Sequence, residues 1–242
     1  MGLTSNKQQE LTKQIQTINK TSRTLVIGGN KNDYNYLKNQ GFTNITINNL
    51  SKNQLKGVKG KLFDITKKPP KLEKFDLIIA LDVLEHTIIP DFALLNIHAL
   101  LKPRGKLVLT TPNLACLVNR VSLLFGWSLP NYAPYFFKDN PLCVVDVMPS
   151  HFFYLAHKNV CTFGQLERNL VALGFKVTCR KGFHYGAVNQ SSGSYNGVRG
   201  LLNKVLPTNF KEGILLVVVK GCLVGEGVVS AYYENSLKEE SK

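Results

Sequence analysis

The fold of this chain is indicated most clearly by residues 75–113, which read FDLIIALDVLEHTIIPDFALLNIHALLKPRGKLVLTTPN. Residues 75–81 form a short and almost continuously apolar run, which is typical of a strand covered on both faces. A helix is predicted from Pro90, where apolar residues recur at helical spacing, and residues 102–105 end it with Pro and Gly. Residues 106–111 predict a second buried strand, so the order strand, helix, strand indicates an α/β sheet.

Polar residues stand where the first of these strands should end. Asp82, Glu85 and His86 follow Leu81 directly or within one turn. Ligands of open α/β sheets bind outside the carboxyl ends of the strands, so these side chains are site candidates. His86 fits a general base, because its unperturbed pKa lies near neutrality, and it equally fits a structural hydrogen-bonding role.

The chain before this stretch has the pattern of the first half of a doubly wound sheet. Strands are predicted at residues 24–27, 45–47 and about 61–63, and a Gly-Gly turn separates the first strand from a helix at residues 34–39. Later in the chain, helices are predicted at residues 114–126 and 162–173, and strands at residues 175–178 and 214–220.

The chain resembles the class I S-adenosyl-L-methionine (SAM)-dependent methyltransferases over about residues 24–220. The motifs that carry the resemblance are FDLIIALDVLEH, LLKPRGKLVLTTPN and ALGFKV. The resemblance implies a doubly wound, seven-stranded, mostly parallel α/β sheet of the Rossmann-like kind. It also implies a helical or loop lid inserted after the fifth strand, and an enzyme that uses SAM.

The same resemblance assigns site residues. In the family, the first turn approaches the methionine part of SAM, the end of the second strand binds the ribose, the loop after the third strand binds the adenine, and the end of the fourth strand lies beside the methionine part. Carried over to this chain, the cofactor-binding residues are Gly28, Gly29, Asn30, Asn49, Asp64, Ile65, Leu81 and Asp82. The catalytic candidates are His86 and His151, the second because the family often places a His near the mouth of the site. Asp64 also fits a simple turn former.

This chain departs from the family pattern in two places. Asn30 and Asn32 stand where further glycines are usual, and we expect Asn to keep the turn because it tolerates left-handed backbone. Asn49 replaces the usual acid, which predicts cofactor binding weaker by about 1–2 kcal/mol, because charge-assisted hydrogen bonds are stronger than neutral ones. A degenerate site that binds no cofactor is the alternative.

The domain organisation follows from composition. Residues 1–22 predict a polar N-terminal tail or amphipathic helix, residues 23–222 the methyltransferase-like domain, and residues 223–242 a polar tail. Residues 114–160 are the predicted lid, whose aromatic residues fit an acceptor pocket, an anchor of the insertion to the core, or both. A membrane-contacting surface is a further, weaker interpretation of the same aromatic residues and the basic charge.

Charge and cysteine content bear on the class of partner, the cellular compartment and metal binding. The formal net charge of +14 favours an anionic partner, although scattered lysines on a solvated surface explain it as well. The five cysteines form no CxxC pair, and the longest apolar runs are too short to span a bilayer, so we expect a cytoplasmic protein. No metal is expected, because His151 and His157 are poorly spaced for ligands and have no acid nearby.

The leading hypothesis is a SAM-dependent methyltransferase that acts on a small-molecule, glycan or lipid-like acceptor, with oxygen favoured as the acceptor atom on family analogy. The alternative is a catalytically degenerate, methyltransferase-like subunit that binds nucleic acid or a protein partner. A nucleic-acid methyltransferase is not favoured, because residues 81–84 lack the Asn/Asp-Pro-Pro-aromatic signature. The absence of GxGxxG argues against a dehydrogenase.

Overall fold

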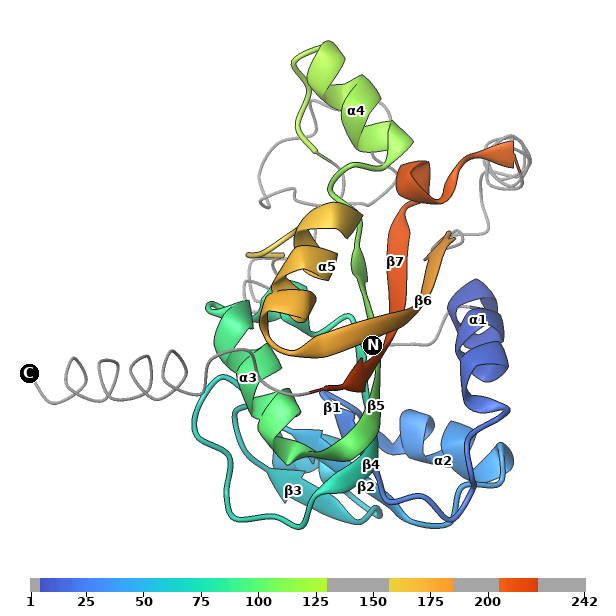
Figure 1. Ribbon diagram of the computed structural model, residues 1–242, viewed down its shortest axis with the longest axis vertical. Coiled ribbons are helices and arrows are strands. Elements are labelled where there is room, and N and C mark those ends of the chain that lie inside the picture. The colour runs from blue at the N-terminus through green and yellow to red at the C-terminus, as the bar shows by residue number, and fades with distance from the viewer. Residues whose placement is uncertain (1–4, 130–156, 185–204, 222–242) are drawn as a thin grey trace, which may run out of the picture.

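The computed structural model describes residues 5–129, 157–184 and 205–221, and a single sheet organises them (Figure 1). The helices of these residues are α1 (Ser5–Ile15), α2 (Lys31–Asn39), α3 (Pro90–Leu100), α4 (Leu117–Leu124) and α5 (Phe163–Ala172). The strands are β1 (Thr24–Ile27), β2 (Ile45–Asn49), β3 (Gly60–Leu62), β4 (Phe75–Leu81), β5 (Leu101–Pro112), β6 (Phe175–Phe183) and β7 (Gly213–Lys220).

The seven strands lie in the order β3-β2-β1-β4-β5-β7-β6. The first five of these are parallel neighbours, whereas β7 runs antiparallel to both β5 and β6. The predicted doubly wound, mostly parallel α/β sheet is therefore confirmed. The chain moves outward from β1 to β3 and then returns to β4 on the other side of β1. This reversal between β1 and β4 is where such sheets bind ligands.

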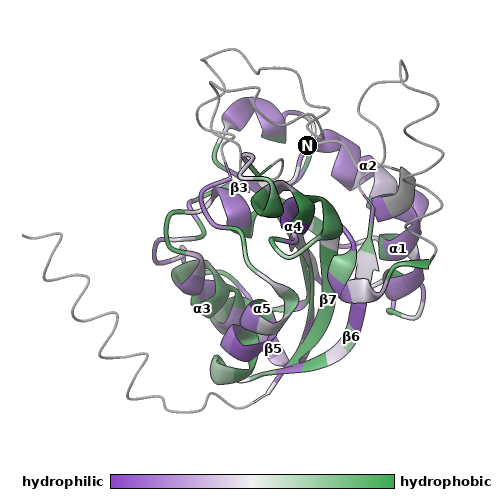
Figure 2. Cartoon of the chain, turned by 90° about the horizontal axis from the view of Figure 1, so that it is seen from above, coloured by the Kyte–Doolittle hydropathy of each residue, from purple (hydrophilic) through white to green (hydrophobic). Residues whose placement is uncertain are grey.

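Both faces of the sheet are covered, which explains the continuous apolar run in β4. On one face, Ile78 and Ala80 belong to the core cluster of α3 and α5; on the other, Leu77 and Ile79 belong to the cluster of α1 and α2. Figure 1 shows α3 and α5 on one side of the strands and α1 and α2 on the other. Strand β7 is coloured as hydrophobic along most of its length in Figure 2.

The first turn keeps its shape by a route other than the one predicted. Gly28 has left-handed backbone with φ of +67°, but Asn30 is extended with φ of −140° and caps α2. The Asn30 side chain accepts hydrogen bonds from the backbone N–H groups of Asn32 and Asp33, and the Asp33 carboxylate accepts one from the Asn30 N–H. This reciprocal capping box starts α2 at Lys31 rather than at residue 34. The expectation that Asn supplies left-handed backbone here was wrong.

The ends of the domain and most of the lid are only partly described. Residues 5–15 form a helix, with Leu11 and Ile15 buried against the sheet, so the helical alternative for the N-terminal segment holds there. Of the predicted lid, α4 is a helix as expected, whereas residues 130–156, with His151, lie outside the described residues. Residues 223–242 also lie outside them. The domain boundaries therefore stay predictions.

One buried histidine makes the stability of the fold depend on pH. His98 of α3 packs its ring edge-to-face on Phe175, with the ring centroids 5.0 Å apart. Burial, followed by the positive charge of Lys220, lowers the pKa of His98 from 6.5 to about 4. Between these values the unfolded chain binds a proton that the folded chain does not, so stability falls as the pH falls.

We expect the wild type to lose about 2 kcal/mol more unfolding free energy than a His98→Gln variant between pH 7 and pH 4.5. The amide of Gln has a similar size but does not titrate in this range, so the difference isolates His98. Urea unfolding at both pH values measures it. Parallel pH profiles for the two proteins would show that His98 carries no such penalty.

Candidate functional site

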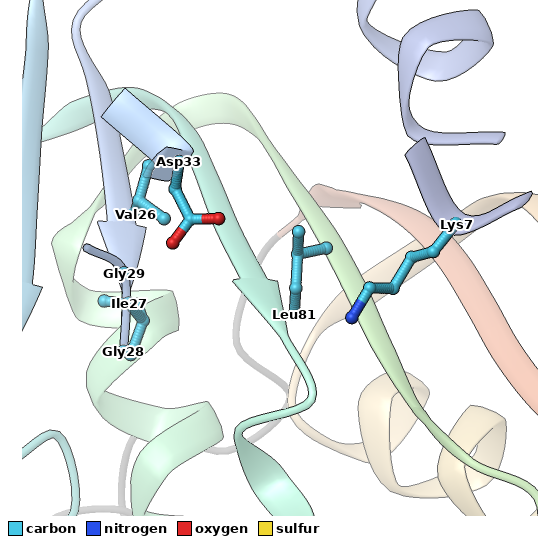
Figure 3. Close-up of a pocket in the computed structure, with 7 residues that line it drawn as sticks. All are labelled: Lys7, Val26, Ile27, Gly28, Gly29, Asp33 and Leu81. Carbon is cyan, nitrogen blue, oxygen red and sulfur yellow. The ribbon is translucent and has the colours of Figure 1, made fainter. Parts of the chain in front are cut away.

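A hollow lies at the carboxyl ends of β1 and β4, at the point where the strand order reverses. Its lining comes from β1, the first turn, the start of α2, the end of β4 and one residue of α1. These residues are Lys7, Val26, Ile27, Gly28, Gly29, Asp33 and Leu81 (Figure 3). Three of the predicted cofactor-binding residues, Gly28, Gly29 and Leu81, are among them.

Both glycines of the first turn are required by their surroundings. A Cβ on Gly28 would sit 3.0 Å from a methyl group of Val83, in a backbone conformation that side chains disfavour. A Cβ on Gly29 would sit 2.7 Å from the Val26 side chain. The absence of these Cβ atoms therefore lets the turn pack closely against Val26 and Val83.

Asp82 is a buried carboxylate held in strained backbone at the end of β4. Its φ is +52° and its residue surface is 8% exposed. Oδ2 lies 2.5 Å from the Lys7 Nζ, and Oδ1 accepts a hydrogen bond of 2.7 Å from the Thr110 hydroxyl. The Asp82 N–H donates back to Thr110. Non-glycine residues rarely adopt positive φ, and here the bonds to Lys7 and Thr110 hold Asp82 in this conformation.

Lys7 lines the hollow and pairs with Asp82, although it is not among the residues predicted from the sequence. It extends from α1 into the hollow, facing the end of β4, and is only 3% exposed (Figure 3). A signal was present in the sequence, because Lys7 stands four residues before Leu11 and eight before Ile15, on the buried stripe of α1. A lysine on the apolar face of a helix needs a buried anion, and Asp82 supplies it.

Asn49 links the first turn to the end of β2. Its Nδ2 donates a hydrogen bond of 2.8 Å to the carbonyl oxygen of Gly29, and its Oδ1 accepts one of 3.0 Å from the Ser51 N–H. The loops that leave β1 and β2 therefore meet, as the predicted cofactor site requires.

The loop after β3 contains the two predicted adenine-binding residues. Asp64 accepts hydrogen bonds through Oδ1 from the N–H and hydroxyl groups of Thr66, which is the local turn that the sequence also allowed. Ile65 is buried, and its carbonyl oxygen accepts a bond of 2.6 Å from Asn96 of α3. This anchoring fixes the loop beside the end of β2, where Asn48 donates to the carbonyl of Phe63.

Beyond Asp82 the chain makes a single 3₁₀ turn, Leu84–His86, that carries a second buried acid. Glu85 is fully buried, and its Oε2 accepts a hydrogen bond of 3.1 Å from Thr111. Burial, and then the negative charge of Asp82, raise the pKa of Glu85 well above its usual range. The ring of His86 faces that of His157, with centroids 5.1 Å apart. The predicted catalytic residue His86 does not line the hollow but follows its residue Leu81 by five positions. In space it lies beside His157, which comes from a distant segment.

Comparisons with known proteins agree on the kind of domain. A family profile described as a methyltransferase domain matches residues 6–179. None of the curated proteins compared with the chain matches it in sequence.

Solved structures with a similar fold come from several organisms. A putative methyltransferase from Bacillus halodurans has a TM-score of 0.58 at 14% identity, covering 88% of this chain and 98% of that one. The putative methyltransferase in a complex with the Trm112 activator from Haloferax volcanii has a TM-score of 0.56 at 9% identity, covering 89% of each chain. A SAM-dependent methyltransferase from Mesorhizobium loti has a TM-score of 0.54 at 16% identity, covering 83% of this chain and 91% of that one. At these identities the likeness concerns the fold.

The structure also bears on membrane insertion. Among the residues that the structure describes, no helix has the length and apolar character needed to cross a bilayer.

Proposed function

Because this chain belongs to the class I SAM-dependent methyltransferase family, we propose that it transfers a methyl group from SAM to a hydroxyl oxygen of a small-molecule, glycan or lipid-like acceptor. The observation that carries the proposal is the buried Asp82, which holds an ammonium group at the carboxyl end of β4. That position is where ligands of doubly wound sheets bind.

The residues of the hollow fit SAM. The methionine part of SAM carries an ammonium group, and the Asp82 carboxylate already binds the ammonium of Lys7 at 2.5 Å. The two glycines of the first turn line the hollow, and Asn49 offers a neutral carboxamide where a ribose would lie. When bound, SAM supplies an activated methyl group on its sulfonium.

The protein's own part in such a reaction is mainly to orient the two reactants. Thr110 fixes the rotamer of Asp82 through its hydroxyl, so the carboxylate is preorganised for a cation. His86 stands on the turn directly after Asp82, and we assign it the role of acting on the acceptor's proton. His151 keeps the role of a second candidate near the acceptor.

A degenerate binding subunit is the second candidate function, and two observations favour it. Lys7 occupies the cation-binding position of Asp82, and both polar atoms of the Asn49 side chain are used within the protein. In this interpretation the Lys7–Asp82 ion pair beside the hollow is structural, and the net charge of +14 attracts an anionic partner.

Titration of the full chain with SAM separates the two functions. In isothermal titration calorimetry with EDTA present, we expect saturable binding of one SAM and a matching rise in unfolding temperature. The absence of both heat and thermal shift at millimolar SAM would favour the binding subunit. Release of S-adenosylhomocysteine with a panel of hydroxyl-bearing acceptors then tests the transfer itself.

A further inference from the structure

Three side chains beside the proposed SAM site bring together the donors of a metal site. One ligand atom from each of Glu85, His86 and His157 lies within 4.8 Å of the other two. Glu85 is fully buried, and the two histidines are half-buried. The cluster joins the turn after β4 to the segment that leads into α5.

Backbone contacts hold these two segments against each other. The carbonyl oxygen of Glu85 accepts hydrogen bonds from the N–H groups of Lys158 (2.6 Å) and Asn159 (3.1 Å). The Asn159 side chain donates to the carbonyl oxygens of Thr87 and Ile88. His157 is therefore placed next to His86 by bonds that do not involve either imidazole ring. Such anchoring is what a preorganised ligand set needs.

One carboxylate oxygen of Glu85 has no hydrogen-bond partner among the described residues. Oε2 accepts from Thr111, so the oxygen without a partner among these residues is the buried Oε1. Buried polar atoms of this kind are rare in folded proteins, and an unfilled ion site is one of the recognised explanations. The ammonium of Lys7 does not fill this role, because it pairs with Asp82.

We infer that Glu85, His86 and His157 form a binding site for a first-row divalent transition-metal cation such as Zn²⁺, Mn²⁺ or Co²⁺. Two imidazoles and one carboxylate suit these ions, whereas Mg²⁺ and Ca²⁺ prefer oxygen ligands alone. In a tetrahedral zinc site, ligand atoms lie about 3.4 Å apart, so modest side-chain rotations close the present cluster around an ion. Three protein ligands leave coordination positions open, as in catalytic metal sites.

This inference departs from the sequence-based expectation of no metal. That expectation compared His157 with His151, its neighbour in the sequence. The structure pairs His157 instead with the Glu85-His86 dipeptide, more than seventy residues away, and sequence spacing could not reveal that approach.

The position of the site suggests its use, and this part rests on the proposed function. Thr110 and Thr111, consecutive on β5, bond Asp82 and Glu85 respectively, so the cation lies beside the ammonium end of the SAM site. A cation held by these residues would lower the pKa of a nearby acceptor hydroxyl, so that the hydroxyl would give its proton to water and its oxygen would keep the electron pair of the O–H bond. That oxygen would be the acceptor atom of the proposed transfer. With a cation bound, His86 would hold the cation, and water would take the proton in place of the His86 imidazole.

The test uses the full chain without a histidine tag, freed of metal by EDTA and then by dialysis. Co²⁺ is titrated and followed by its visible absorption, and Zn²⁺ by calorimetry. We expect one equivalent to bind, with binding at least tenfold weaker in His157→Ala and in Glu85→Gln. His98→Gln is the matched control, because His98 is a buried histidine on the same chain away from the cluster. Its affinity should equal that of the wild type.

Several results would overturn the site. These are the absence of saturable binding, equal affinity in His157→Ala and the wild type, or a thiolate-to-Co²⁺ charge-transfer band showing that a cysteine binds the ion. If one variant does not fold by circular dichroism, the other carries the test. Because metal binding is measured without SAM, and SAM binding with EDTA, each proposal can fail alone: SAM binding without metal binding refutes only this inference.

Discussion

Asp82→Asn is expected to weaken SAM binding about a hundredfold, which corresponds to roughly 2–3 kcal/mol for a buried hydrogen bond to a charged group. The carboxylate is 8% exposed and fixed by Thr110, so it binds an ammonium with little reorganisation. An Asn side chain keeps the shape and the bond from Thr110 but removes the charge. Isothermal titration calorimetry measures the change directly.

Asp76→Asn is the matched control for this variant. Asp76 lies near the opposite, amino end of the same strand β4, where it accepts from the Arg23 N–H and pairs with Lys102. Its substitution removes the same charge from the same strand but leaves the hollow intact. SAM affinity in Asp82→Asn equal to that in Asp76→Asn would remove Asp82 from the proposed site.

Lys7→Met is expected to tighten SAM binding about tenfold, because it removes an internal competitor for Asp82. The ligand-free variant should also unfold at a lower temperature, since a buried carboxylate without its cation is destabilising. SAM would then supply the missing ammonium, so its thermal shift should exceed that of the wild type. Calorimetry and thermal unfolding, each with and without SAM, give the two quantities.

Lys13→Met serves as the control on the same helix. Lys13 pairs with Glu10 across one turn of α1, and its side chain is 62% exposed, so its loss should change neither quantity. Weaker SAM binding in Lys7→Met would contradict the competition and show that Lys7 itself helps to hold the ligand. The double variant of Lys7 and Asp82 measures the coupling between the two residues.

The sheet could be predicted from the sequence because its signals are local. The apolar run of residues 75–81 became β4 with unchanged bounds, since burial on both faces removes the need for polar alternation. The family resemblance implied seven mostly parallel strands, and the order in which they lie comes from the structure. The first turn is an exception. The residue type of Asn30 suggests left-handed backbone, whereas in the structure its backbone is extended and its side chain caps α2.

The site was less predictable because its key contacts join distant segments. Lys7 reaches Asp82 across 75 positions of sequence, and His157 meets His86 through backbone bonds between two loops. The periodicity of α1 places Lys7 on the buried face of that helix but does not identify its partner, and no spacing pattern reveals the approach of His157 to His86. Asn49 and Asp64 were found by position, but their hydrogen bonds within the protein could be seen only in three dimensions.

The placement of β7 has a consequence for synthesis of the protein on the ribosome. Residues 213–220 insert between β5 and β6, although they are made after both. Until they emerge, β5 presents an unpaired backbone edge along its buried second half, which includes the apolar residues 107–109 and the neighbouring Thr110 and Thr111. The nascent chain therefore carries an aggregation-prone edge until β7 emerges and pairs with it.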